Sequence, residues 1–383
     1  MPALARFLVV FAATLAAAAT IGKLVPHIPR LAAQFDVSLA AAGFLVSSVM
    51  LPGAFAGPLF GALVDRVPPR RVALFGLALG ALSSFALPFA PNLWFFLLVR
   101  VLEGAGYTFV VVAATLIVVE VSASRHRSLA LATFSSFAPL GFALGQLFAA
   151  GASDPATALG HAAVLGFMLA LVAASAPRTK VNPPATRANV VHALRHPPAL
   201  RTGMAFGCVA GLLLGAVALA PLVLASRLGL TVEETARLTA AAALPGIAGR
   251  FLSGWLLGRS APLRVFAVAA ALGLLFIPAA LIAPLPLAAA LAGFAVFQIC
   301  MGALAGILSA MLPQVAPSPA QFGTVTGLAN QMVTAGNLVG PPLVLGVYAA
   351  AGATAAAAVL AAALAVSVWL VSGVAVYRRA LAS

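Results

Sequence analysis

The chain has 383 residues and a net charge of +14, and it is 63% hydrophobic but only 7% charged. Soluble domains carry about 25% charged residues. This composition therefore excludes a soluble globular protein and makes lipid the solvent for most of the chain. The apolar runs are continuous and do not alternate, which excludes a transmembrane β-barrel.

Taken in chain order, the apolar segments predict an all-α membrane protein with twelve transmembrane helices. A helix needs about 20 predominantly apolar residues to cross a bilayer. The predicted spans cover residues 7–25, 40–63, 72–90, 93–118, 128–150, 158–176, 202–224, 235–257, 263–283, 287–312, 323–349 and 353–377. The joints at 91–92 and 284–286 are so short that they predict tight helical hairpins.

The basic residues mark topology rather than a nucleic-acid partner. With the N-terminus inside, 15 Lys and Arg residues fall on the inner side, 3 on the outer side and 3 within or at the ends of spans. This asymmetry predicts that both termini are cytoplasmic and that the basic loops contact anionic headgroups of the bilayer. Nineteen arginines against two lysines, with many alanines, are typical of a GC-rich bacterial genome and predict the bacterial inner membrane.

The chain carries signs of an internal duplication. The longest polar stretch, 177–201, is predicted to be a cytoplasmic linker between two pseudo-symmetric six-helix bundles at 1–176 and 202–383. Landmarks recur in order at offsets of 193 to 198: Gly61, Leu63, Arg66 and Arg71 with Gly254, Leu256, Arg259 and Arg264; Ser38 with Thr231; Pro26 with Pro221; Gly141 and Gly145 with Gly336 and Gly340; and Arg100 and Gly104 with Gln298 and Gly302. A duplicated membrane protein of this kind points to transport.

The run 61–71 places one acid and three arginines between two spans. Asp65 lies at the C-terminal end of span two, where its own helix dipole disfavours a carboxylate. It should therefore bind either the arginines beside it or the amide end of another inner helix. The alternative is a solvated charge cluster that only sets topology, although anchoring alone would not call for an acid.

These motifs carry a resemblance to a known family. The run 61–66 resembles the loop between spans two and three of the major facilitator superfamily, and 100–106 resembles its span-four motif. The resemblance covers the whole chain and implies two six-helix halves that rock about a substrate near the midplane, with spans one, four, seven and ten lining the cavity. It also implies a conformational latch made by Gly61, Asp65, Arg66, Arg70 and Arg71. Pro68 replaces the glycine of the family pattern, which affects the expected turn but not the charges.

Arg100 and Glu103 are candidates for proton coupling. They stand three residues apart on one helical face, with Tyr107 a further turn along. Charges inside a span face a cavity or pair with each other. One interpretation is a local ion pair. The other makes Glu103, the only carboxylate placed well inside a span, the proton carrier, with Arg100 as its switch or as an anion ligand.

The candidates for the substrate cavity are polar residues within spans: Lys23, Arg100, Tyr107, Gln298, Asn330, Gln331, Thr334 and Asn337. For Lys23, near the predicted outer end of span one, snorkelling to the interface is the preferred interpretation. Asn330, Thr334 and Asn337 share one helical face and are either interhelical contacts or cavity lining. Arg250 is expected near the inner surface, with a further possibility of substrate contact.

The sequence thus favours a proton-coupled secondary transporter that works as a monomer and moves a small organic solute, anionic or zwitterionic, across the inner membrane. The alternative within the class is a drug–proton antiporter. Family exporters carry Gly-x-x-x-Gly-Pro in span five, whereas 134–141 keeps Pro139 and lacks both glycines. A membrane enzyme would need clustered catalytic groups and a receptor a folded cytoplasmic domain, and neither is found. No metal-ligand spacing or cofactor motif is present.

Overall fold

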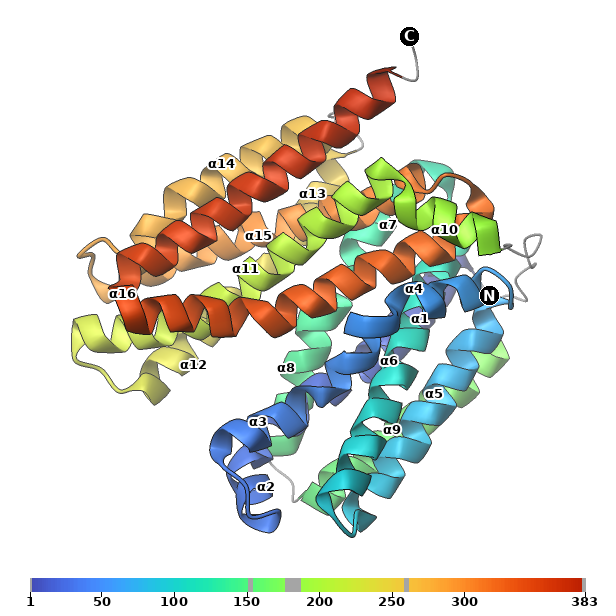
Figure 1. Cartoon of the computed structure of the whole chain (residues 1–383), viewed down its shortest axis with the longest axis horizontal. Coiled ribbons are helices and arrows are strands. Elements are labelled where there is room, and N and C mark those ends of the chain that lie inside the picture. The colour runs from blue at the N-terminus through green and yellow to red at the C-terminus, as the bar shows by residue number, and fades with distance from the viewer. Residues whose placement is uncertain (1, 151–153, 176–186, 258–261, 381–383) are drawn as a thin grey trace. The chain divides into compact units, whose positions relative to one another are not determined.

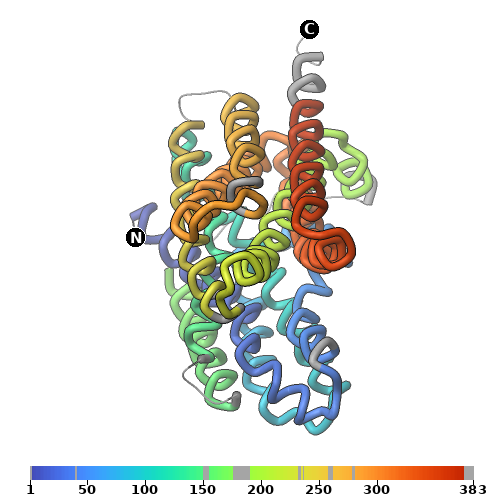
Figure 2. The backbone as a smooth tube through the Cα atoms, turned by 90° about the vertical axis from the view of Figure 1, so that its left-hand side faces the viewer, coloured from blue at the N-terminus to red at the C-terminus, as the bar shows by residue number. Residues whose placement is uncertain are grey.

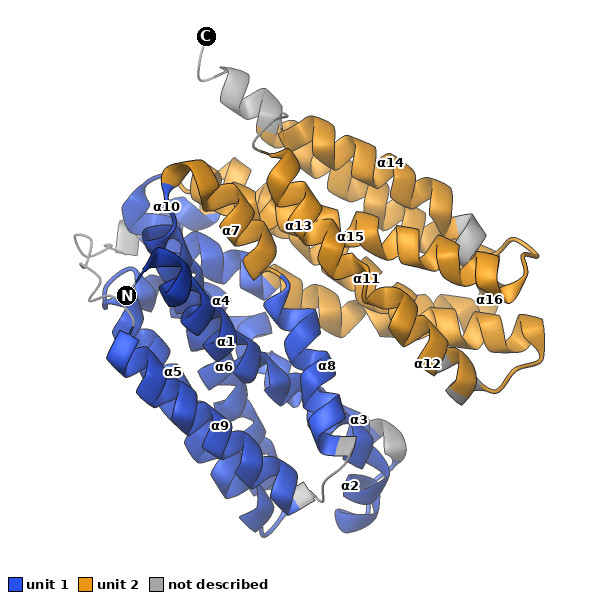
Figure 3. Cartoon of the chain, turned by 180° about the vertical axis from the view of Figure 1, so that it is seen from behind, with its two compact units in different colours: residues 1–123, 136–194, 317–331 blue, residues 124–135, 195–316, 332–383 orange. Residues whose placement is uncertain are grey.

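The computed structural model describes residues 2–150, 154–175, 187–257 and 262–380, and these residues form helices and turns without a strand. They fall into two compact units (Figure 3). The first unit comprises residues 1–123, 136–194 and 317–331, and the second comprises 124–135, 195–316 and 332–383. The division into halves at 177–201 stays a prediction.

The first unit is built on three helices that share one core: α1 (Ala3–Gly22), α6 (Leu93–Val121) and α5 (Pro69–Ala86). α1 packs against α6, α8 and α9, and α5 packs against α6 and α9 (Figure 1). The remaining elements are η1 (Val25–His27), α2 (Ile28–Gln34), α3 (Leu39–Ser47), η2 (Ser48–Met50), α4 (Leu51–Val64), η3 (Leu87–Phe89), α8 (Phe137–Ala150), α9 (Asp154–Ser175), α10 (Arg187–Arg195), η5 (Pro319–Gln321) and the beginning of α16 (Phe322–Ala380).

The second unit is centred on α15 (Leu287–Val315), which packs against α7, α11, α12, α13 and α14. Its other elements are η4 (Ser124–His126), α7 (Arg127–Phe134), α11 (Pro197–Leu228), α12 (Val232–Ala243), α13 (Gly246–Leu256), α14 (Pro262–Leu281) and the later part of α16. α16 is broken at Gly352, whose φ of 80° lies in the left-handed region that glycine tolerates. Figure 2 shows the two segments of α16 running in different directions.

The all-helical membrane fold predicted from the sequence is confirmed. Nine helical segments of the described chain are long and apolar enough to cross a membrane. One of them, Pro319–Val374, covers the predicted span 323–349 and most of the predicted span 353–377, with a break in the helix at Gly352. The two remaining predicted spans correspond to α14 and to the pair α12–α13. Part of the predicted linker is also helical, because α10 forms and α11 already begins at Pro197; residues 176–186 lie outside the described ranges.

Local signals in the sequence set several helix ends. Thr231 and Glu234 form the predicted capping box at the start of α12. Asn92 accepts a hydrogen bond from the Phe95 amide (2.9 Å) and so starts α6 directly after the 91–92 joint. Pro69 occupies the first turn of α5, where its missing amide hydrogen is not needed.

Glycines let helices cross at backbone distance, and the same crossings occur in each unit. A Cβ built on Gly104 of α6 would lie 2.0 Å from the Val49 carbonyl oxygen, and one on Gly302 of α15 would lie 1.9 Å from that of Gly246. The other predicted pairs behave alike: Gly141 and Gly145 of α8 pack on α1, while Gly336 and Gly340 of α16 pack on α11. The duplicated glycines therefore serve as close helix contacts.

Candidate functional site

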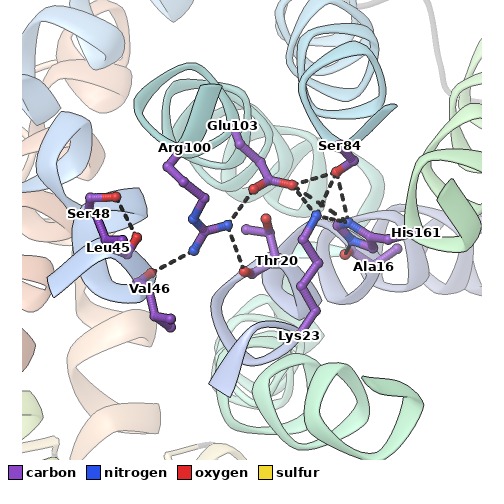
Figure 4. A network of polar contacts seen from close by, with 10 residues as sticks. All are labelled: Ala16, Thr20, Lys23, Leu45, Val46, Ser48, Ser84, Arg100, Glu103 and His161. Carbon is purple, nitrogen blue, oxygen red and sulfur yellow. Dashed lines mark hydrogen bonds and ion pairs between the residues drawn. The ribbon is translucent and has the colours of Figure 1, made fainter. Parts of the chain in front are cut away.

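A buried ionic network lies inside the first unit, centred on Glu103 of α6 (Figure 4). The Glu103 side chain is 1% exposed and forms ion pairs with both Lys23 and Arg100. Each carboxylate oxygen binds a different cation. Oε1 accepts a hydrogen bond from the Lys23 amino group, and Oε2 accepts one from the Arg100 guanidinium. The predicted Arg100–Glu103 pair is present, and it is part of a larger assembly.

Lys23, the C-cap residue of α1, supplies the second cation. Besides Glu103, its Nζ bonds the Ser84 hydroxyl (2.8 Å) and lies 3.0 Å from His161 Nδ1. The preferred interpretation of Lys23 as a snorkelling residue was wrong, because its side chain is fully buried. The physical reason is that the apolar segment continues through η1 and α2 to Gln34, which places Lys23 within the span rather than at its end.

Arg100 ties α6 to two other helices. Its Nη1 donates to the Thr20 carbonyl of α1 (3.3 Å), and its Nη2 donates to the Val46 carbonyl of α3 (2.6 Å). The Val46 carbonyl, which lies close to the junction of α3 and η2, thus receives a hydrogen bond from a charged side chain. Arg100 is therefore both a partner of Glu103 and a structural clamp.

Sequence reasoning missed two members of the network, Ser84 of α5 and His161 of α9. The Ser84 hydroxyl donates to Glu103 Oε1 and lies 3.0 Å from His161 Nδ1. The other ring nitrogen of His161 lies 2.9 Å from the Ala16 carbonyl oxygen. A lone ionisable residue in an apolar span is a functional signal by itself, so His161 could have been found; Ser84 carried no such signal.

Asp65, the C-cap residue of α4, makes the second notable site of this unit. Its carboxylate accepts hydrogen bonds from the backbone amides of Gly323 (2.7 Å) and Thr324 (2.8 Å) and from the Thr324 hydroxyl (2.6 Å). The partner is thus the amide end of another helix, α16, one of the two partners expected. Burial raises the pKa of the Asp65 carboxyl, whereas the hydrogen bonds from Thr324 and Gly323 act in the opposite direction.

The rest of the run 61–71 surrounds this contact. A Cβ on Gly61 would lie 2.1 Å from the Gly323 carbonyl oxygen, so a glycine is needed for the approach. Arg70 donates to the Ala173 carbonyl at the end of α9. Arg66 and Arg71 are exposed. Pro68 stands where the family pattern has a glycine. It fits there because it is the N-cap residue of α5.

The predicted cavity residues are divided between the two units. Lys23, Arg100, Tyr107, Asn330 and Gln331 belong to the first unit, and Gln298, Thr334 and Asn337 to the second. Tyr107 is buried on α6 but is not a member of the network drawn in Figure 4. The Gln331 amide donates to the Phe55 carbonyl (3.4 Å), as an interhelical contact would. The polar residues of α16 are thus assigned partly to one unit and partly to the other.

The second unit contains a buried cation of a different kind. Arg250 of α13 is 6% exposed, its Nη1 donates to the Gly246 carbonyl (3.2 Å), and its Nε has no hydrogen-bond partner within the described chain. Gln298 of α15 is 3% exposed, and its Oε1 is likewise unpaired among the described residues. Gly246, one turn before Arg250, packs directly on the Gln298 backbone. Arg250 and Gln298 therefore sit at the same helix crossing.

Comparisons with known proteins agree with this architecture. An uncharacterized MFS-type transporter, YwoD of Bacillus subtilis, is 34% identical over 112 residues, which is 29% of this chain and 25% of the relative. Multidrug resistance protein 2 of the same species is 26% identical over 125 residues, covering 33% of this chain and 31% of the relative. The aligned regions thus span only about a quarter to a third of these relatives.

Solved structures show the same fold. The human organic anion transporter MFSD10 (TETRAN) superposes with a TM-score of 0.79 at 18% identity, covering 97% of this chain and 100% of that one. The MFS transporter FucP in the outward conformation gives a TM-score of 0.76 at 17% identity, with 96% and 98% coverage. The sequence profile of the Major Facilitator Superfamily matches residues 7–341. The chain belongs to the Major Facilitator Superfamily and is a multi-pass membrane protein with the fold of that family.

Proposed function

We propose that this transporter is a proton-coupled secondary active transporter of a small anionic or zwitterionic organic solute in the bacterial inner membrane. It works as a monomer by alternating access, with both termini cytoplasmic. The observation that carries the coupling is the buried network of Glu103, Arg100 and Lys23. Ionisable groups inside a span are costly and mark ion pathways and proton relays.

The proposed substrate class is supported by the small number of acidic residues in the second unit. Its sequence contains two carboxylates, Glu233 and Glu234, both at the first turn of α12. Glu234 is engaged in the capping box with Thr231. Neither Glu233 nor Glu234 belongs to α13, the helix that carries Arg250, and the sequence of α13 contains no carboxylate. A buried cation without a counterion is strongly unfavourable, and a substrate carboxylate would neutralise it.

Gln298 makes a zwitterion or a hydroxy acid a better match than a simple anion. Its unpaired Oε1 is an acceptor, and its amide group also offers donors. A ligand with a carboxylate for Arg250 and an ammonium or hydroxyl group for Gln298 would satisfy both side chains. Thr334 and Asn337 of α16 are further candidates for polar contacts in this unit.

The latch role of Asp65 also remains part of this proposal. The contact joins span two of the predicted N-terminal half to the start of span eleven of the predicted C-terminal half. A carboxylate at a helix N-terminus is stabilised by the free amides and by the dipole. A contact made in one conformation and broken in another would bias the transport cycle without touching substrate.

A ligand screen tests the substrate class. Purified protein is heated with a panel of carboxylates, amino acids and lipophilic cations, because a ligand that binds only the folded state raises the apparent stability. At about 100 times its Kd a ligand adds about 2.7 kcal/mol. We expect stabilisation by a carboxylate or amino acid and its loss in Arg250→Gln, whereas Arg264→Gln, which removes an exposed arginine from α14, keeps it.

Export of amphipathic drugs is the second candidate function. It is favoured by the likeness to Multidrug resistance protein 2 over a third of this chain. In that case a lipophilic cation such as ethidium, and no carboxylate, would stabilise the protein, and cells producing it would retain less ethidium. That outcome would overturn the anionic substrate class.

A further inference from the structure

The network of the first unit contains one more positive than negative charge. Lys23 and Arg100 are cationic and Glu103 is anionic, and all three side chains are at most 1% exposed. His161, 4% exposed, lies 3.8 Å from Glu103 Oε1 through its Nδ1. With a neutral His161 the network has a net charge of +1, and the loss of one proton would make it neutral. A single unbalanced charge is expensive among side chains as deeply buried as these.

Hydrogen bonds assign the tautomer of His161. A backbone carbonyl can only accept, so the contact of Nε2 with the Ala16 carbonyl (2.9 Å) places the ring hydrogen on Nε2. The Nδ1 atom then carries a lone pair. That lone pair faces the Lys23 amino group and the Ser84 hydroxyl, each at 3.0 Å (Figure 4). His161 is therefore held as a base next to an ammonium group.

The Lys23 ammonium group has three hydrogens and three acceptors. It donates to Glu103 Oε1, to the Ser84 hydroxyl oxygen and to His161 Nδ1. The Ser84 hydroxyl donates in turn to Glu103 Oε1. Each donor is thus satisfied, and transfer of one proton from Nζ to Nδ1 needs no rearrangement of heavy atoms.

We infer that the proton that couples transport resides on the Lys23–His161 pair, while Glu103 stays a carboxylate between its two cations. This inference rests on the proposed proton-coupled function. In the loaded state Lys23 carries the proton. In the transfer step the Nζ–H bond breaks and an Nδ1–H bond forms, which gives a neutral amine and an imidazolium. Release of that proton to water leaves a neutral amine, a neutral imidazole and a network of zero net charge.

The elements around the pair supply these same groups. α6 contributes Arg100 and Glu103, α5 contributes Ser84 and α9 contributes His161, while α3 offers the Val46 carbonyl to Arg100. α8, which also packs on α1, has no titratable residue in its sequence. The nearby His27 of η1 contacts Thr157 (Nε2 to Oγ1 3.3 Å). Arg100 keeps its proton at any physiological pH. Each carboxylate oxygen of Glu103 accepts a hydrogen bond from a cation, which favours the ionised carboxylate. We therefore assign the exchanged proton to Lys23 and His161.

The lysine count makes a direct test possible. The chain has two lysines, Lys23 and Lys180, so the variant Lys180→Arg leaves Lys23 as the single lysine. Purified Lys180→Arg protein labelled at lysine Cε and histidine ring nitrogens is titrated by NMR. We expect Lys23 to lose its proton within the pH range in which the protein stays folded, with His161 shifting in the same step. His161→Gln should move the Lys23 titration.

Infrared difference spectroscopy over the same pH range examines Glu103. We expect that Glu103 gives no band of a protonated carboxyl group. Glu103→Gln and Glu103→Asp serve to assign such a band, because a band from Glu103 would be lost or shifted in these variants. A carboxyl band that is assigned to Glu103 would overturn the inference. So would an NMR titration in which Lys23 stays charged and the signals of His161 do not shift over the whole pH range. Both measurements need only the folded protein and protons as the probe, so they do not depend on the identity of the substrate.

Transport separates this inference from the proposed function. One coupled proton sustains about tenfold accumulation for each unit of pH difference, since tenfold corresponds to about 1.4 kcal/mol. With a substrate from the ligand screen, Lys23→Arg should abolish this tenfold accumulation but keep substrate exchange, because a guanidinium retains the charge and does not release its proton. Native protein that titrates at Lys23 yet never accumulates substrate would overturn the proposed coupling. Proton-driven accumulation that persists in Lys23→Arg would overturn the inference but not the proposed function. If Lys23→Arg does not fold, the NMR titration of Lys23 decides.

Discussion

Asp65 and Thr324 are joined twice at a single carboxylate oxygen. The Thr324 amide (2.8 Å) and the Thr324 hydroxyl (2.6 Å) both donate to Asp65 Oδ2, while Oδ1 accepts from the Gly323 amide. A carboxylate that is 3% exposed and receives three donors is fixed in position by its partners. The contact therefore connects the end of α4 to the start of α16 through charge as well as packing.

Asp65→Asn should weaken this connection, because one amide hydrogen of the new side chain must face a backbone donor. Hydrogen bonds to charged groups contribute about 1.5–3 kcal/mol. Thermal unfolding should show a loss of this order, and Thr324→Val a smaller one. In the double variant the two losses should be less than additive. Additive losses would mean that Asp65 and Thr324 act independently.

For transport, Asp65→Asn should lower the exchange rate more than it lowers substrate binding, since Asp65 is proposed to act on conformation. Binding to the solubilised protein is compared with counterflow in proteoliposomes. A collapse of binding with unchanged accessibility of the two faces would contradict the latch.

Glu103→Gln should be strongly destabilising, because it leaves Lys23 and Arg100 buried without a counter-charge. Removing one partner of a buried ion pair costs about 3–5 kcal/mol. Glu103→Gln combined with Lys23→Met should recover part of the loss, since one cation is removed with the acid. The measurement is the midpoint of thermal unfolding in detergent. Equal stability of the single and double variants would show that Lys23 is not balanced by Glu103.

Gly61→Ala should destabilise the first unit by about 1–3 kcal/mol, the usual range for overpacking. Its new Cβ would lie 2.1 Å from the Gly323 carbonyl oxygen, and backbone atoms cannot move aside as a side chain can. The matched control is Gly166→Ala in α9, where no atom lies within 4 Å. That change should be neutral or stabilising, because alanine favours a helix.

Reporter fusions test the topology. Fusions after Ser383 and within 187–195 should be active only with a cytoplasmic reporter, because 15 basic residues lie on the predicted inner side. Arg30, Arg227 and Arg237 are the basic residues of the predicted outer side. A periplasmic signal from either fusion would reverse the orientation.

The sequence predicted features that depend on local chemistry. The capping box at Thr231 follows from hydroxyl and carboxylate spacing, and the Asp65 contact with a helix N-terminus follows from the unfavourable dipole of its own helix. The duplicated glycines were recognisable because close helix crossings need small residues at fixed intervals. These signals lie within one helix turn of the residues concerned.

The interior of the network was less accessible to prediction. Periodicity places Arg100 and Glu103 on one face of α6, but it does not say which faces of α1, α5 and α9 meet that face. Lys23, Ser84 and His161 come from those three helices. The end of the first span was also set too early, since Ile28–Gln34 continues it, and Lys23 was placed at the interface for that reason.

The crossing of α4 with α16 has one more consequence. Gly57 and Gly61 meet Gly327 and Gly323 backbone to backbone, and none of these residues has a side chain to immobilise. Ordering a side chain costs up to about 2 kcal/mol of rotamer entropy, so a seam of glycines avoids that loss. The side chains of Asp65 and Thr324 restore specificity at its end. Such a seam can part and close again repeatedly with little entropic penalty, while the charge fixes the register at which it closes.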